Sequence, residues 1–60
     1  MFVIKRNDGA FVAKSGNPSS YTRDLANARK WPTRESADSE RCFDNERTID
    51  LERELDRFRA

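Results

Sequence analysis

The sequence predicts a small α+β fold, in which an antiparallel β-meander packs one or two short helices on one face. Three observations predict it: an Asp-Gly turn between two β-favouring runs, a helix N-cap at Thr33, and a C-terminal segment whose apolar spacing changes from strand to helix period. The 60 residues can form only a single mini-domain, 1–60, with a small core. The six aromatic side chains must therefore supply much of that core.

Residues 2–14 are predicted to form a β-hairpin. The β-favouring runs Phe-Val-Ile and Phe-Val flank an Asn-Asp-Gly turn, which is a strong hairpin signal because Gly9 can adopt a positive φ without a Cβ clash. A two-residue turn would pair Ile4 with Ala13, whereas a type I turn followed by a glycine bulge would pair Ile4 with Val12. We prefer the second register because it opposes two β-branched side chains.

The third strand of the meander is predicted near residues 27–31. It follows a polar loop at 15–20, in which every residue is a turn former or small and polar, and a turn around 22–26. Pro32 favours an extended conformation for the residue before it, which supports a strand that ends there.

A helix over residues 34–42 is predicted to begin after Thr33, whose side chain suits the N-cap, and Glu35 suits the positive end of the helix. Its apolar face is thin, with Ala37 at the centre, so the helix can be stable only when it packs on the sheet. An Asp-Asn turn at 44–45 then leads into the last segment.

The C-terminal segment has two interpretations. Thr-Ile-Asp-Leu alternates as a strand should, and the later apolar residues Leu51, Leu55 and Phe58 recur at helical spacing. We expect a short strand at 47–51 and a helix at 52–59, and the alternative is one helix from 48 to 59. The expected core is Phe2, Ile4, Val12, Leu25, Trp31, Ala37, Phe43, Ile49, Leu51 and Leu55.

The composition argues against catalysis, a resident metal and a disulfide. The chain has no His, the usual general base, and its single cysteine, Cys42, can form no disulfide within the chain. Zinc sites need several His or Cys ligands, and two Gly cannot form a glycine-rich phosphate loop. We therefore expect a non-enzymatic protein with no catalytic residue, cofactor or metal. We interpret Cys42 as a small buried residue at a helix end rather than a reactive thiol.

The cysteine content and the N-terminus predict a cytoplasmic protein without a membrane partner. A lone Cys fits a reducing compartment. Only four apolar residues precede Lys5 and Arg6, too few for a signal-peptide core or a membrane span.

The charge of the chain is divided by position. Residues 1–34 carry seven Lys or Arg against two acids, whereas residues 35–60 carry five Arg against nine acids. The first segment interleaves its cations with aromatic residues, as surfaces that bind single-stranded nucleic acid do. Its candidate partner-binding residues are Lys5, Arg6, Lys14, Tyr21, Arg23, Arg29 and Lys30. A second interpretation is internal complementarity, in which the basic strands face the acidic helices.

Two blocks of the sequence resemble segments of known proteins. They are Phe-Val-Ile-Lys-Arg-x-Asp-Gly-x-Phe-Val-Ala (2–13) and Ser-Tyr-Thr-x-x-Leu-x-x-Ala-Arg-x-Trp-x-Thr-Arg-Glu-x-Ala (20–37). Together they cover half of the chain and resemble small uncharacterised accessory proteins that phages and prophages encode. The resemblance carries over no catalytic or binding residue. It implies a protein acting inside a bacterium, similar in size and type to proteins that inhibit host factors, including anti-CRISPR proteins.

These observations give one expected function and two alternatives. We expect a non-enzymatic accessory protein that binds a bacterial host or phage protein and modulates it, by inhibition. The first alternative is a small nucleic-acid-binding protein that uses the basic segment 1–34. The second is a homodimer with a structural or assembly role.

Overall fold

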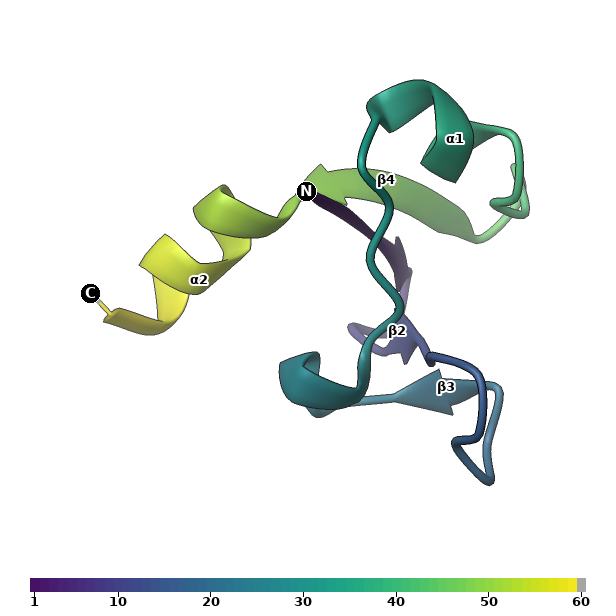
Figure 1. Ribbon diagram of the computed structural model, residues 1–60, viewed down its shortest axis with the longest axis horizontal. Coiled ribbons are helices and arrows are strands. Elements are labelled where there is room, and N and C mark those ends of the chain that lie inside the picture. The colour runs from purple at the N-terminus through teal and green to yellow at the C-terminus, as the bar shows by residue number, and fades with distance from the viewer. Residues whose placement is uncertain (60) are drawn as a thin grey trace.

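The computed structural model describes residues 1–59 of the chain, and side chains as far as Arg57, as a four-stranded antiparallel sheet with short helices (Figure 1). The strands are β1 (Phe2–Arg6), β2 (Phe11–Val12), β3 (Tyr21–Thr22) and β4 (Glu46–Asp50). The helices are the 3-10 helix η1 (Leu25–Asn27) and the α-helices α1 (Arg34–Asp38) and α2 (Leu51–Arg59). The strand order β3-β2-β1-β4 places the N-terminal strand inside the sheet and confirms the predicted α+β class.

The hairpin of β1 and β2 has the register that the sequence favoured. Lys5 lies opposite Phe11, and the turn between the strands is closed by the Gly9 N–H, which donates to the Arg6 carbonyl at 2.9 Å. Gly9 has a φ of +96°, a conformation that L side chains rarely adopt, and this identifies the glycine bulge after a type I turn. The Arg6 N–H donates to the Ala10 carbonyl at 2.6 Å across the bulge.

The third strand lies at Tyr21–Thr22 and not at residues 27–31, so the predicted position was wrong. The Asp24 side chain caps η1 by accepting the Ala26 N–H, and η1 includes Asn27, the first residue of the predicted strand. The segment after η1 is extended but meets the sheet only at single bridges, with Ala28 beside the end of β2 and Trp31 beside the start of β1.

Helix α1 begins where predicted and ends four residues earlier. The Thr33 side chain accepts the Ser36 N–H, which confirms the N-cap. Ala37 is the buried residue of the helix, and the positions one turn later are Glu40 and Arg41, which supply no apolar side chain to continue the contact. The chain therefore leaves the helix after Asp38 and turns towards β4.

The C-terminal segment is a strand followed by a helix, as expected, with the boundary one residue earlier than predicted. The Asp50 side chain accepts the Glu52 N–H at 2.9 Å and so ends β4 and caps α2, which excludes a single helix from 48 to 59. The side chain of Phe58, part of the predicted apolar stripe, lies outside the described residues. No helix within residues 1–59 has the length and apolar character needed to cross a membrane.

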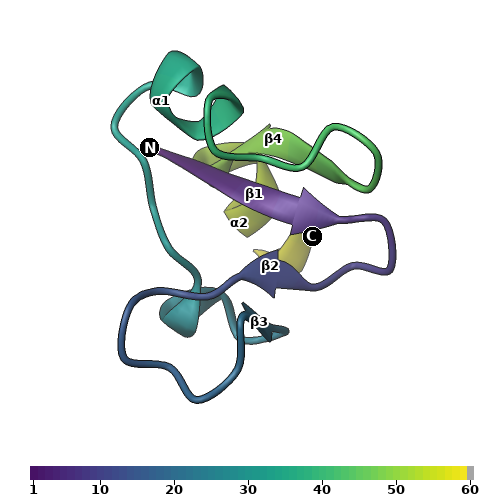
Figure 2. The ribbon, with the colours of Figure 1, turned by 90° about the vertical axis from the view of Figure 1, so that its right-hand side faces the viewer.

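The helices cover opposite faces of the sheet, and not one face as predicted. Val3 and Ile4 are adjacent on β1 and therefore point to opposite faces, and both are almost fully buried. Ile4 packs with Trp31 and with Ala37 of α1, whereas the cluster around Val3 includes Leu25 of η1 and Leu51 of α2. Figure 2 shows α2 behind the strands and α1 above β4.

The core is centred differently from the predicted one. Its buried apolar residues are Val3, Ile4, Ala10, Phe11, Ala28, Trp31 and Ala37. The other predicted core residues that pack against them in half-buried positions are Phe2, Val12, Leu25, Ile49 and Leu51. Two predictions were wrong, because Phe43 is 77% exposed and Leu55 is 38% exposed. Phe11 and Val3 were missed because a one-faced sheet would have turned them to solvent.

Candidate interaction surface

The first predicted binding residue, Lys5, holds α2 against the sheet. Its Nζ lies 2.8 Å from Oε1 of Glu54, and the two side chains are only 13% and 3% exposed. The ammonium also lies 5.5 Å from the centre of the Phe11 ring. Glu54 falls one helical turn after Leu51, on the face that packs against the sheet. This pair is therefore internal, and Lys5 offers little surface to a partner.

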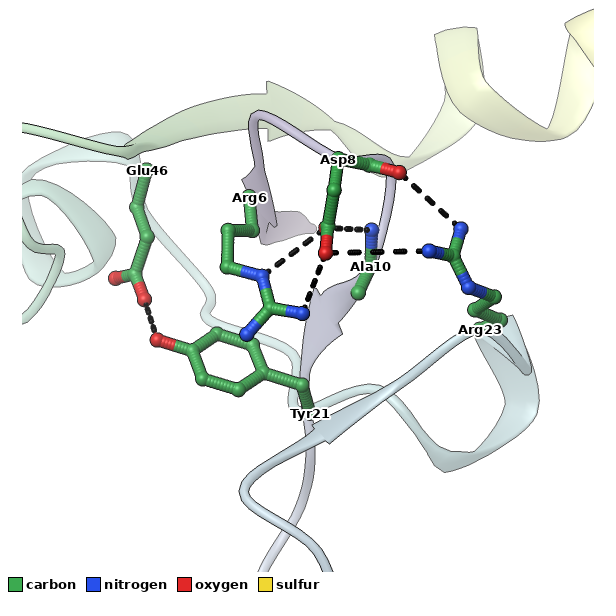
Figure 3. Close-up of polar contacts among 6 residues, drawn as sticks. All are labelled: Arg6, Asp8, Ala10, Tyr21, Arg23 and Glu46. Carbon is green, nitrogen blue, oxygen red and sulfur yellow. Dashed lines mark hydrogen bonds and ion pairs between the residues drawn. The ribbon is translucent and has the colours of Figure 1, made fainter.

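Three more of the predicted residues gather around Asp8, at the turn of the hairpin (Figure 3). Arg6 stacks over the Tyr21 ring at 4.0 Å from its centre and donates to both carboxylate oxygens of Asp8, at 3.0 and 2.5 Å. Arg23 reaches the same residue from the segment after β3, donating to the Asp8 carbonyl at 3.2 Å. Asp8 thus fastens two arginines and the tyrosine ring into one cluster.

The contacts of this cluster shift the pKa values of its members. The pKa of Asp8 is lowered to about 2, first because Arg6 donates to its carboxylate and then because the Ala10 N–H does so at 3.0 Å. The pKa of Arg6 is raised by the same hydrogen bond. The pKa of Tyr21 is also raised, because its phenol donates a hydrogen bond to the Glu46 carboxylate.

Glu46 connects the hairpin cluster to β4. It is 7% exposed, and its carboxylate accepts the Tyr21 hydroxyl and the Cys42 N–H, the latter at 2.8 Å. Its backbone carbonyl accepts Nη1 of Arg41 at 2.8 Å. Glu46 is one of the nine acids of residues 35–60, and no local pattern in the sequence marks it as buried. It is the first residue of β4, where the Tyr21 hydroxyl and the Cys42 N–H both donate to its carboxylate.

The remaining predicted residues lie apart from the cluster. Arg29 lies 3.5 Å from the Glu40 carboxylate and stacks 5.0 Å from the centre of the Trp31 ring. Lys30 donates to the backbone carbonyls of Leu25, the first residue of η1, and Ala28, its C-cap, at 3.2 and 3.1 Å. Lys14 is exposed, and its ammonium has no partner among the side chains that the structure describes. The seven residues are therefore not joined in one basic patch.

A different feature is exposed in the turn between α1 and β4, at residues 41–45. Phe43 is 77% exposed, and the Arg41 guanidinium lies 4.3 Å from the centre of its ring. Arg41 is itself held by the Glu46 carbonyl at 2.8 Å and by the Asp38 carboxylate at 3.5 Å. The turn therefore exposes an aromatic ring that is stacked on an arginine held by two other contacts. Cys42, expected to be buried, is exposed in the same turn, because the helix that should have carried it ends at Asp38.

Strand β4 runs from this turn to α2 along one edge of the sheet (Figure 1). At the α2 end, a pocket of about 440 Å³ is lined by Arg34, Thr48, Ile49, Asp50 and Arg53. Three exposed arginines lie on or beside this strand, and none forms an ion pair with the side chains described up to Arg57: Arg34, Arg47 and Arg53. We use "β4 surface" for the turn 41–45, the outer edge of β4 and this pocket.

No protein-family model, curated protein or solved structure matches the chain. The geometry of its own residues therefore carries the functional argument. Within residues 1–59, no three His, Cys, Asp or Glu side chains are arranged to hold a metal ion. The β4 surface combines an exposed aromatic ring, unpaired arginines and a strand edge, and these groups can bind another polypeptide.

Proposed function

We propose that this chain is a non-enzymatic protein-binding module that modulates, by inhibition, a protein of a bacterial host or phage. The observation that carries the proposal is the Phe43 ring, which is exposed and backed by Arg41 at 4.3 Å. Aromatic residues and Arg are enriched at the centres of protein interfaces. A chain with a small core leaves one of its few rings outside, on a turn already held in place, so little ordering entropy would be lost on binding.

The cellular setting of the proposal comes from the sequence. The blocks 2–13 and 20–37 resemble small accessory proteins that phages and prophages encode. This resemblance supports a role in the bacterial cytoplasm, of the type that anti-CRISPR proteins exemplify. A compact chain that lacks His is suited to binding and blocking another protein rather than to chemistry of its own.

The nucleic-acid alternative has less support from the contacts of the basic segment. Stacking on bases needs exposed aromatic faces. Phe11 and Trp31 are buried, and one face of the Tyr21 ring is covered by Arg6. Two of the cations that phosphates would need, Lys5 and Arg29, already have carboxylate partners.

The test is affinity capture from a bacterial lysate, with and without nuclease. The wild-type chain is expected to retain a stoichiometric protein partner after nuclease treatment. The Phe43→Ser variant is expected to lose it, and Leu55→Ser, which removes another exposed hydrophobic side chain, is expected to keep it. Retention that disappears with nuclease would support the nucleic-acid alternative, and recovery of the chain alone would support self-association.

A further inference from the structure

The outer edge of β4 carries a free pair of backbone hydrogen-bonding groups. The Asn7 N–H donates to the Asn45 carbonyl at 2.9 Å, and the Leu51 N–H donates to the Met1 carbonyl at 3.0 Å. Hydrogen-bonded and non-hydrogen-bonded pairs alternate in an antiparallel ladder, so every second residue of β4 turns its backbone groups towards β1. Thr48 belongs to the other set, and its N–H and carbonyl point outwards.

Within the described residues, no hydrogen bond involves the N–H or the carbonyl of Thr48, whose hydroxyl donates to the Asp38 carboxylate of α1. β4 is the last strand of the sheet on this side. At the neighbouring outward position, the Glu46 N–H donates to the Cys42 carbonyl at 2.9 Å, and the Glu46 carbonyl accepts Arg41. The turn therefore closes one end of the edge and leaves Thr48 open. An open edge of this kind accepts an added strand.

The open part of the edge lies beside positive charge. Arg34 and Arg53 line the pocket of about 440 Å³ together with Thr48, and neither has a carboxylate partner among the side chains described. Arg34 is positioned by stacking 5.0 Å from the centre of the Phe2 ring. The acid of the pocket, Asp50, is engaged in capping α2. An incoming carboxylate would therefore meet two arginines that are free to bind it.

We propose that the outer edge of β4 binds an extended, acidic peptide segment of a partner protein by strand addition. Thr48 exchanges both backbone hydrogen bonds with the peptide, and a Glu or Asp side chain of the peptide enters the pocket between Arg34 and Arg53. This inference rests on the proposed protein-binding function and names the chemistry of the partner. The Phe43 ring, at the other end of β4, would contact the flanking part of that partner.

A second copy of this chain fits the edge less well than an acidic segment does. Two β4 strands paired antiparallel about Thr48 would place Glu46 of each chain opposite Asp50 of the other. Like charges directly opposite each other destabilise a strand pair. The backbone groups of Glu46 are also already engaged, so the Glu46 of each chain would fail to make its two ladder bonds and such a dimer would lose four.

The experiment measures fluorescence anisotropy with a labelled probe peptide, Thr-Val-Glu-Val-Glu-Val-Thr, whose Glu side chains share one face of a strand. We expect the chain to bind this probe and to bind its Glu-to-Gln counterpart about tenfold more weakly, because the charge-assisted hydrogen bonds are lost. A probe with N-methylated alternate amides should bind at least about tenfold more weakly, because it cannot complete the ladder.

The protein side of the experiment uses three exposed cations. Arg34→Gln and Arg53→Gln should each weaken binding of the acidic probe about fivefold to tenfold, and Lys14→Gln, which removes an exposed charge elsewhere, should leave it unchanged. Three results would each overturn the proposal. The Gln probe could bind as tightly as the acidic probe, the N-methylated probe could bind as tightly as the unmethylated one, or the acidic probe could fail to bind. If the probe fails while wild-type chain still captures a nuclease-resistant partner, strand addition is wrong and the protein-binding function stands.

Discussion

The two halves of this chain have opposite charge by composition, and the structure reverses what that composition suggests about partners. In residues 1–34, cations outnumber acids by seven to two, yet Lys5, Arg6 and Arg29 are held by carboxylates or stacked on aromatic rings. In residues 35–60, acids outnumber cations by nine to five, yet Arg47 and Arg53 have no ion pair with a described side chain. The charge available to a partner is therefore decided by pairing in the fold and not by segment totals.

The largest effect is expected at the buried ion pair that links the two halves. Glu54→Ala should lower the free energy of unfolding by about 3 kcal/mol, because it leaves the Lys5 ammonium largely buried without its carboxylate. Urea denaturation measures the change, and Glu52→Ala, an exposed position on the same helix, is the control.

A double variant distinguishes the loss of the Lys5–Glu54 ion pair from the loss of side-chain packing at the same positions. Lys5→Met combined with Glu54→Leu should restore most of the lost stability, because two apolar side chains can replace a buried ion pair. If Glu54→Ala unfolds at the same urea concentration as the wild type, the two halves are not joined by this contact.

A smaller effect is expected where the hairpin meets β4. Tyr21→Phe should lower the free energy of unfolding by about 1 kcal/mol, because the buried Glu46 carboxylate loses a hydrogen-bond donor. The effect should depend on pH, because the pKa of Tyr21 is raised in the folded state. The protonated Tyr21 phenol contributes its full stabilisation below the unfolded pKa of about 10. This stabilisation is lost as the pH rises through the higher pKa of the folded state.

Spectroscopic titration of the single tyrosine checks this prediction directly. The tyrosinate absorbance of the folded chain should develop at higher pH than that of the urea-unfolded chain. Coincident titration curves would mean that the Tyr21–Glu46 contact does not form in solution.

A still smaller effect on stability is expected at Asp8, the carboxylate of the hairpin cluster. The folded pKa of Asp8 is about 2 against an ordinary value of 3.8, so its stabilising contribution is present above about pH 4 and is lost as the pH falls towards 2. Asp8→Asn should make the unfolding transition less dependent on pH in this window. Ser15→Ala, an exposed position that removes no titratable group, is the control.

The smallest effect on stability is expected at the β4 surface itself. Arg53→Gln and Phe43→Ser should each change the free energy of unfolding by less than about 0.5 kcal/mol, because both side chains are exposed and carry no core contact. Thermal denaturation measures this change. A loss of more than about 1 kcal/mol in either variant would show that the residue serves the fold and would remove it from the interaction surface.

Local signals in the sequence were sufficient to predict several elements of the fold. The Asp-Gly turn predicted the hairpin because Gly9 can adopt the positive φ of the bulge, and the pairing of the β-branched Ile4 and Val12 favoured the register that forms. Thr33 predicted the start of α1, and the change of apolar period predicted the boundary between β4 and α2 to within one residue. Each of these features is decided by residues that are near neighbours in the chain.

Features that depend on distant contacts were missed. The third strand lies earlier in the chain than predicted because Asp24 caps η1, and Trp31 instead pairs with Phe2 of β1 at an isolated bridge. Glu54 is buried only because Lys5, 49 residues earlier, lies under α2. Phe43 is exposed because α1 stops short of it. The β4 surface could not be predicted because it depends on which strand ends the sheet and on which arginines remain unpaired.

We expect partners to bind at the β4 surface, which includes Arg34, and not at residues 5–30 of the basic segment. Amide chemical-shift mapping, with the acidic probe peptide added to isotope-labelled chain, locates the binding surface. We expect the largest shifts on residues 47–53, around Thr48, with Lys14 and Arg23 unchanged. Large shifts at residues 5–14 and 21–30 with β4 unchanged would contradict it and return the function to the basic segment.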